Sequence, residues 1–271
     1  AGTEYLKSPG FQNAWAQQLY YWIPASGGSL SFGDDMNTPG IFNHLDAAFF
    51  ICPSLSRDKN IQAALKRRFD KTSVRKDDRP YDYPWSLLAF YDPTIGEGDA
   101  MAVPTTRTFG DLGAATMRDT WDDGAVLFGF KCGPYGGFKL NEYRDEVREE
   151  NGDPHYVNVA HDDPDANSFA LSVGPDFIFH PGVYSTKKLT EQNNTLTVDG
   201  KGQVKEGDAY TQPVPKTDMR ELSYLTGWKE GDGGRAIIEG EAGAAYSSLK
   251  QFRRTAIWMP GEYILLLDNI Q

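Results

Sequence analysis

The sequence of 271 residues is poor in cysteine, in histidine and in long apolar runs. Its two cysteines, Cys52 and Cys132, are too few for a disulfide scaffold or a structural zinc site, and the sequence leaves their pairing open. No apolar run approaches the roughly 18 residues of a membrane span. No secretory leader opens the chain, although one that has been removed would leave no trace. We therefore expect no membrane-spanning segment.

Basic residues are in the minority. The chain has 27 Lys and Arg against 38 Asp and Glu, for a formal net charge of −11. This balance argues against nucleic acid as a partner, because such proteins usually present a basic surface. The 39% hydrophobic and 13% aromatic content excludes disorder as the main state. The 28 Gly and 16 Pro indicate many turns, and hence a β-rich part.

The first hundred residues have the apolar periodicity of helices. Residues 11–22, 42–52 and 61–69 each place apolar side chains near a 3.6-residue period. Ser56 or Asp58 is placed to cap the third of these helices. We therefore predict an α-helical domain.

The pattern changes near Pro104, where short apolar runs begin to alternate with turn signals. The predicted strands are residues 125–132, 168–173, 177–179, 195–198, 235–239, 252–258 and 263–267. The charged residues 140–153 are either a helical excursion or an exposed loop. Together these patterns predict an α+β multidomain chain, with an α-helical domain over residues 1–103 and an antiparallel β-sandwich over residues 104–271.

The final apolar strand stops at Gln271 with no following strand to pair with. An unpaired apolar edge favours association with other strands. We therefore expect that the chain is part of a larger protein, or that another chain or a missing segment completes the domain.

Polar residues concentrate at three neighbouring strand ends. His155 and His161 lie in a polar run that ends at Ser168, His180 follows the next apolar run, and Asn193 precedes another. Because antiparallel pairing brings successive strand ends together, these residues are expected to converge on one site.

Three segments in this order carry a resemblance. They are His-Asp-Asp-Pro-Asp-Ala-Asn-Ser-Phe from His161, His-Pro-Gly-Val-Tyr from His180, and Asn-Asn-Thr-Leu-Thr-Val-Asp-Gly from Asn193. The set resembles the heparinase II/III-like polysaccharide lyases and the related dermatan-sulfate epimerase, well over roughly residues 105–200 and only in pattern elsewhere. In that superfamily a toroid of α-helical hairpins precedes an antiparallel β-sandwich, with the active site between them. The resemblance implies that residues 1–103 are part of such an (α/α) toroid.

The resemblance implies two catalytic residues. The first motif histidine of the family falls on His161, and a tyrosine near the substrate falls on Tyr184. Proton removal at C5 of a uronate and protonation of the leaving oxygen suit these side chains. The family's tyrosine in the helical domain has no clear match, because Tyr5 is out of register.

The resemblance also implies a metal site. Asp163, His180 and Asn193 occupy the positions where the family usually has His, Asp and His. A carboxylate, an imidazole and an amide oxygen suit one divalent ion, zinc, manganese or calcium. We further predict that Arg107, Arg118 and Asn167 bind substrate, the arginines by offsetting the charge of an anionic polysaccharide.

The leading hypothesis is a lyase that cleaves a uronate-containing polysaccharide of alginate, ulvan or glycosaminoglycan type by β-elimination. One alternative is a uronate C5-epimerase of the same superfamily, which shares most of the residues. Another is a non-catalytic carbohydrate-binding relative, and a glycoside hydrolase is a more distant one because no motif selects its carboxylate pair. The family's polymers imply a secreted or periplasmic protein.

Overall fold

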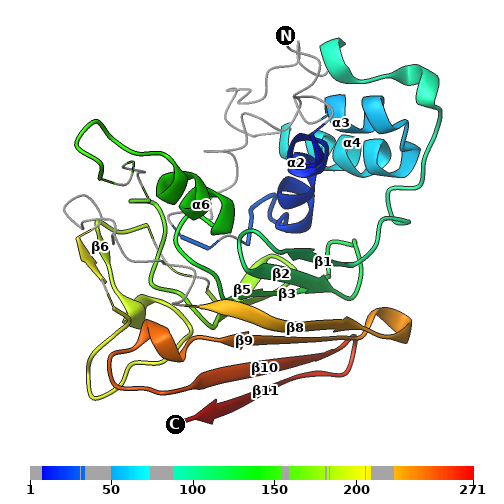
Figure 1. Cartoon of the computed structure of the whole chain (residues 1–271). Helices are drawn as coiled ribbons and strands as arrows, with labels where there is room; N and C mark the ends of the chain where they lie inside the picture. Colours follow the sequence, from blue (N-terminus) through cyan, green and yellow to red (C-terminus); the bar gives the residue numbers. More distant parts are fainter. Residues whose placement is uncertain are drawn as a thin grey trace.

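The fold is mixed α+β, with two antiparallel sheets and few helices (Figure 1). The computed structural model describes residues 8–30, 32–33, 50–73, 88–153, 155, 159–180, 182, 184–204, 206–208 and 223–271. None of the helices within these ranges is long and apolar enough to cross a membrane.

Three helices precede the sheets: α2 (Pro9–Tyr20), α3 (Ile51–Ser56) and α4 (Lys59–Ser73). Helix α2 begins where Ser8 Oγ accepts a hydrogen bond from Phe11 N at 3.3 Å, with Pro9 at the first helical position. Asp58 precedes helix α4 and caps it, because its Oδ1 accepts hydrogen bonds from the backbone N–H groups of residues 60 and 61 at 3.0 Å each. Of the two predicted caps, Asp58 is therefore the one used.

The first sheet has five strands in sequential order, β1 (Thr106–Phe109), β2 (Ala114–Arg118), β3 (Val126–Lys131), β4 (Ser168–Val173) and β5 (Asp176–Phe179). The second has the order β11-β10-β9-β8, with β8 (Tyr224–Glu230), β9 (Ala236–Glu241), β10 (Phe252–Met259) and β11 (Tyr263–Ile270). A third, two-stranded sheet pairs β6 (Lys187–Lys188) with β7 (Gly207–Asp208).

Shorter helical elements join the strands. Helix α6 (Phe138–Glu146) lies between β3 and β4 and overlaps the first part of the charged residues 140–153, for which the sequence predicts either a helix or a loop. The 3-10 turns are η2 (Pro93–Ile95), η3 (Thr190–Gln192), η5 (Asp232–Gly234) and η6 (Gly243–Ala245).

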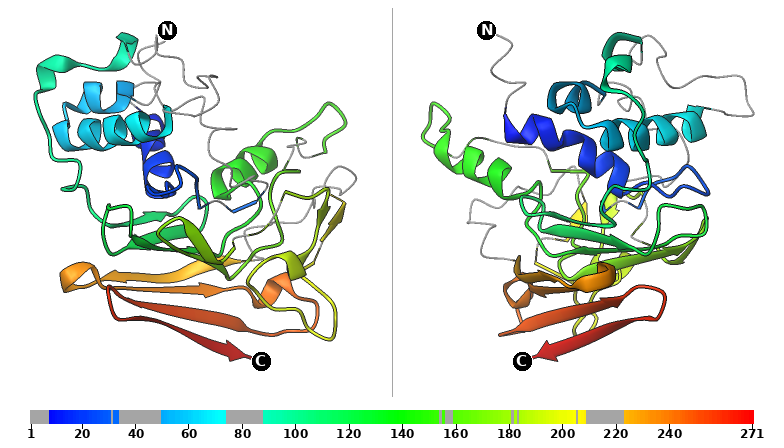
Figure 2. Two further views of the ribbon diagram at one scale, coloured as in Figure 1. Left: turned by 180° about the vertical axis from the view of Figure 1, so that it is seen from behind. Right: turned by 90° about the vertical axis from the view of Figure 1, so that its right-hand side faces the viewer.

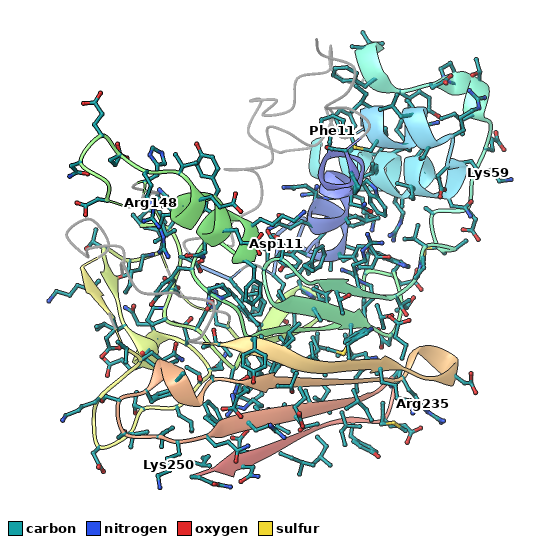
Figure 3. All side chains as sticks on the ribbon, in the orientation of Figure 1. Phe11, Lys59, Asp111, Arg148, Arg235 and Lys250 are labelled. Carbon is teal, nitrogen blue, oxygen red and sulfur yellow. The ribbon has the colours of Figure 1, made fainter. Side chains whose placement is uncertain are left out.

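The main apolar core lies between the two large sheets, as the stacked layers in Figure 2 and the side chains in Figure 3 show. Phe128 of β3 stacks on Trp258 of β10, with ring centroids 6.5 Å apart and planes tilted by 19°. The other face of the first sheet is also covered, because Leu127 and Ala170 pack against Ile23 and Leu30. Burial on both faces explains why all five residues of β2 are buried.

The helices sit on that second face and have a core of their own (Figure 1). Trp15 and Leu19 of α2 pack with Leu65 of α4 in one buried cluster, which Trp121 from the β2–β3 turn joins. The sheet is therefore a shared wall between the helical layer and the second sheet.

Six of the seven predicted strands coincide with β3, β4, β5, β9, β10 and β11. The prediction for residues 195–198 is wrong, because only an isolated bridge between Val198 and Lys201 forms there. The sequence does not predict strands β1, β2 and β8, nor the two-residue strands β6 and β7. Of the helix expected over residues 42–52, most lies outside the described residues. Cys52 and Cys132 are both buried free thiols.

Strand β11 is paired along its whole length with β10, from Phe252 opposite Ile270 to Met259 opposite Tyr263. It forms one edge of its sheet. Alternate residues Tyr263, Leu265 and Leu267 are exposed on the outer face.

Candidate functional site

A cavity of about 280 Å³ lies on the helical side of the first sheet. In Figures 1 and 2, α2 and α6 stand side by side over this face, and the cavity is lined by residues of both. The lining residues are Gln17, Tyr21, Phe32, Leu112, Ala114, Lys131, Pro134, Gly136, Leu140, Val159, His161 and Asp162. One site thus draws on the helical part, the sheet and the long excursion between β3 and β4.

Helix α6 forms one wall of the cavity, and the β1–β2 turn holds its first residues. Asp111 Oδ1 accepts a hydrogen bond from Lys139 N at 2.7 Å, and the Asp111 carbonyl accepts from Phe138 N at 2.8 Å. Figure 3 shows Asp111 at the lower end of the helix. A carboxylate at a helix N-terminus satisfies free N–H groups and complements the helix dipole.

His161 is exposed at the cavity, and a close backbone contact positions it. Gly33, with φ of +90°, approaches so closely that a Cβ there would lie 2.5 Å from the His161 carbonyl oxygen. The glycine thus lets the segment after α2 meet the segment that carries His161. The predicted catalytic histidine lies in the cavity.

The floor of the cavity carries a buried lysine between two carboxylates. Lys131 Nζ lies 2.5 Å from Asp162 Oδ1 and 2.9 Å from Asp165 Oδ1. Asp162 Oδ2 also accepts a hydrogen bond from Gly136 N at 2.6 Å, which holds the turn after β3. The three side chains fix His161 through its neighbour, Asp162.

Burial and charge act in opposite directions on this group. Burial lowers the pKa of Lys131, but the two carboxylates outweigh it and hold that pKa above its ordinary value. Burial raises the pKa of Asp165 to about 7, against the opposing charge of Lys131. Lys131 therefore stays charged, and its charge is largely committed to the two aspartates.

Tyr21 is a cavity residue that sequence reasoning missed. Its ring is held edge-on by Phe109 and Phe32, at centroid distances of 5.4 and 6.4 Å. Burial raises the pKa of Tyr21 above its ordinary value, so the phenol stays protonated. Tyr21 follows the last residue of α2, one turn after Gln17, and helical spacing alone could not separate it from its neighbour Tyr20. The Tyr5 considered earlier lies outside the described residues.

Tyr184 does not line the cavity. Its side chain is 47% exposed, and it follows β5 by several residues. Its predicted catalytic role stays a prediction.

The three residues predicted to bind substrate also lie outside the cavity lining. Arg118 is fully buried, with Nη2 donating to the carbonyls of Tyr20 at 2.7 Å and Trp22 at 2.9 Å. Asn167 is also fully buried, and its Nδ2 donates to the carbonyl of Phe252 at 2.7 Å across the sandwich. In this structure the contacts of both side chains are structural and both are buried, and their predicted contact with substrate stays a prediction.

Arg107 is half-buried, and helix α2 holds it. Its Nη2 donates to Asn13 Oδ1 at 2.8 Å, and its guanidinium lies over the Trp15 ring at 5.7 Å. Its predicted contact with substrate stays untested.

The three residues predicted to bind metal gather beside Gly182. A Cβ on Gly182 would lie 2.9 Å from Asn193 Oδ1 and 3.2 Å from Asp163 Oδ2, so both oxygens face one point. Gly182 N donates to His180 Nδ1 at 3.3 Å. Asn193 Oδ1 is buried and receives no hydrogen bond from any residue that the structure describes. The three residues thus lie close together, and their role as metal ligands stays a prediction.

A lysine already forms an ion pair with the carboxylate of that cluster. Lys188 Nζ lies 3.1 Å from Asp163 Oδ1, and both side chains are almost fully buried. Because the one carboxylate of the donor set is already paired with an ammonium, the set fits the predicted divalent ion poorly, although the ion itself stays a prediction.

Comparisons with known proteins agree with the architecture. The fold resembles that of the heparan sulfate lyase HepC from Pedobacter heparinus, with a TM-score of 0.59 and 17% identity over 99% of this chain and 33% of that one. It also resembles a heparinase III structure, with a TM-score of 0.55 and 13% identity over 97% of this chain and 35% of that one. A second heparinase III structure is similar with a TM-score of 0.55 and 15% identity, over 93% of this chain and 30% of that one.

The chain therefore spans about a third of the length of these structures. At these identities the likeness shows the fold. No family model matches the sequence, and no curated protein matches it.

Proposed function

We propose that the chain carries part or all of the active site of a polysaccharide lyase that cleaves a uronate-containing polymer by β-elimination. The observation that carries the proposal is the meeting of His161 and Tyr21 in one cavity between the helical layer and the sandwich. The heparan sulfate lyase HepC, a third of whose fold the chain resembles, supports the same class of chemistry.

In β-elimination a base removes the proton at C5 and the bond from C4 to the leaving oxygen breaks. The electron pair of the C5–H bond forms the C4–C5 double bond, and an acid protonates the departing oxygen. His161 has an imidazole ring whose nitrogen can accept the C5 proton. Tyr21, a protonated phenol, can supply the proton to the leaving oxygen. Each positioned proton-transfer group contributes on the order of 10² to 10⁴ in rate.

The uronate carboxylate must be stabilised while C5 carries negative charge. Gln17 lies in the cavity and offers an uncharged amide donor for this purpose. Lys131 is less suited, because its ammonium is held by two aspartates. A substrate of this kind is a polymer met outside the cytoplasm, so we propose a secreted or periplasmic protein.

The test is ultraviolet absorbance of the unsaturated uronate product, with alginate, ulvan, heparan sulfate and chondroitin sulfate as substrates. The variants are His161→Ala and Tyr21→Phe. The matched control is His155→Ala, because His155 pairs with Glu149 at 2.6 Å and does not line the cavity. We expect one polymer to give product, and the two cavity variants to lose at least about 100-fold in kcat while the control keeps its rate.

Full activity in His161→Ala would overturn the assignment of the base. An epimerase would instead incorporate solvent deuterium at C5 without shortening the polymer. Saturable binding with neither product would identify a carbohydrate-binding relative.

A further inference from the structure

The cluster beside Gly182 already contains a cation of its own. We propose that the Lys188 ammonium is the resident cation of the cluster formed by Asp163, His180 and Asn193, and that this cluster is held together without a bound divalent ion. The proposal is independent of the proposed lyase activity, because it concerns charge and stability.

The lysine is built into the site by its strand. Lys188 lies in β6 opposite Gly207 of β7, and its exposed neighbour Lys187 lies opposite Asp208. Because successive side chains of a strand point to opposite faces, fixing the exposed Lys187 directs Lys188 inward. Lys188 is 1% exposed and Asp163 is 4% exposed. The ammonium and the carboxylate are both buried and lie 3.1 Å apart. Removing either one would leave the charge of the other buried and unpaired.

The charges around the pair leave little to balance a divalent ion. Asp163 is neutralised by Lys188, while His180 and Asn193 are donors that can be neutral. The neighbouring carboxylates of Asp162 and Asp165 are both engaged by Lys131. A divalent ion on Asp163 would therefore share one carboxylate with a buried ammonium, and the like charges would repel each other in surroundings that screen them weakly.

The turn that follows Lys188 also carries another member of the cluster. Asn193 belongs to the same turn, because its Nδ2 donates to the carbonyl of Leu189, the residue after Lys188, at 3.3 Å. Glu206 also stabilises this turn, because its Oε2 accepts a hydrogen bond from Thr190 N at 2.8 Å.

The experiment compares the wild-type chain with K188M, K188R and K187M. Each protein is incubated with excess Zn²⁺, Mn²⁺ or Ca²⁺ and desalted, and its metal content is measured by mass spectrometry. Its unfolding temperature is then recorded with and without EDTA. K187M is the matched control, because it removes a lysine from the same strand at an exposed position.

We expect wild type to retain well below one equivalent of each ion and to unfold at the same temperature with EDTA. K188M should unfold about 10 °C lower, because the carboxylate of Asp163 is left buried and unpaired. K188R should keep most of the wild-type unfolding temperature, and K187M all of it.

Two results would overturn the proposal. One is a wild-type protein that holds about one equivalent of metal and unfolds at lower temperature when EDTA removes it. The other is a K188M variant as stable as K187M. The wild-type measurement decides the matter even if K188M does not fold, and neither readout depends on substrate.

Discussion

The carbonyl oxygen of His161 occupies the space that a side chain on Gly33 would need. The ideal Cβ position lies 2.5 Å from that oxygen, well inside van der Waals contact. The proposed base therefore depends on a glycine that lies far away in the sequence and outside any regular element.

Gly33→Ala should move the His161 segment and reduce the rate of the proposed reaction. The added methyl group meets the carbonyl oxygen, and φ of +90° strains any residue with a Cβ. We expect kcat to fall about 10- to 100-fold, measured by product absorbance. Gly96→Ala is the control for strain alone, because Gly96 has φ of +87° and nothing within 4 Å of its added Cβ. Equal losses in the two variants would contradict the positioning role.

Arg118→Met should weaken the attachment of α2 to the first sheet. The substitution removes the guanidinium that donates hydrogen bonds to the carbonyls of Tyr20 and Trp22. It also removes the guanidinium that lies 3.9 Å from the centre of the Trp121 ring. We expect a loss of about 2–4 kcal/mol in the free energy of unfolding, measured by urea denaturation.

Arg107→Met is the comparison for that measurement. Arg107 is half-buried and makes its hydrogen bond to Asn13 at the surface, so its loss should cost less than about 1 kcal/mol. Similar losses for the two arginines would show that Arg118 has no special role in the attachment.

The stability of the chain should carry a pH dependence that arises from Asp165. Burial raises the pKa of Asp165 to about 7 in the folded chain, against about 3.9 for an unfolded aspartate. The folded state therefore binds the proton more tightly. The resulting stability is fully present below pH 4 and is lost as the pH rises through 7.

Asp165→Asn removes this titration while keeping a side chain of similar shape. We expect the stability of wild type relative to Asp165→Asn to fall by about 1–3 kcal/mol between pH 5 and pH 8, measured by denaturant unfolding. An increase in that relative stability over the same interval would show that the ion pair with Lys131 dominates and that the pKa shift has the opposite sign.

The part of the fold that sequence patterns predicted is the part with clear periodicity. Strand β10 alternates buried and half-buried residues without a break, so its place was evident. Strand β2 was missed because both of its faces are buried and its polar residues Thr116 and Arg118 face the helical layer. Strand β8 was missed for the opposite reason, because most of its side chains are exposed.

Sequence patterns could identify site residues only where several of them lie in one short segment. The motif residues His161 and Asp163 come from one segment; His161 lines the cavity, Asp163 pairs with Lys188, and their predicted roles stay predictions. Lys131 pairs with Asp162 and Asp165, which lie 31 and 34 residues further along the chain, and the sequence around Lys131 does not predict that contact. Tyr21 and Gly33 reach the cavity only through the packing of the helical layer on the sheet.

The excursion between β3 and β4 begins and ends at a single rung of the ladder, where Lys131 stands opposite Ser168. The ion pair of Lys131 with Asp165 closes this excursion at its base. Residues inserted near α6, between the two anchored ends, would therefore leave the pairing of β3 with β4 unchanged. Asp165 and Asn167 at the end of the excursion are instead fixed by the sandwich, so variation has room only in the part of the excursion that stands away from it.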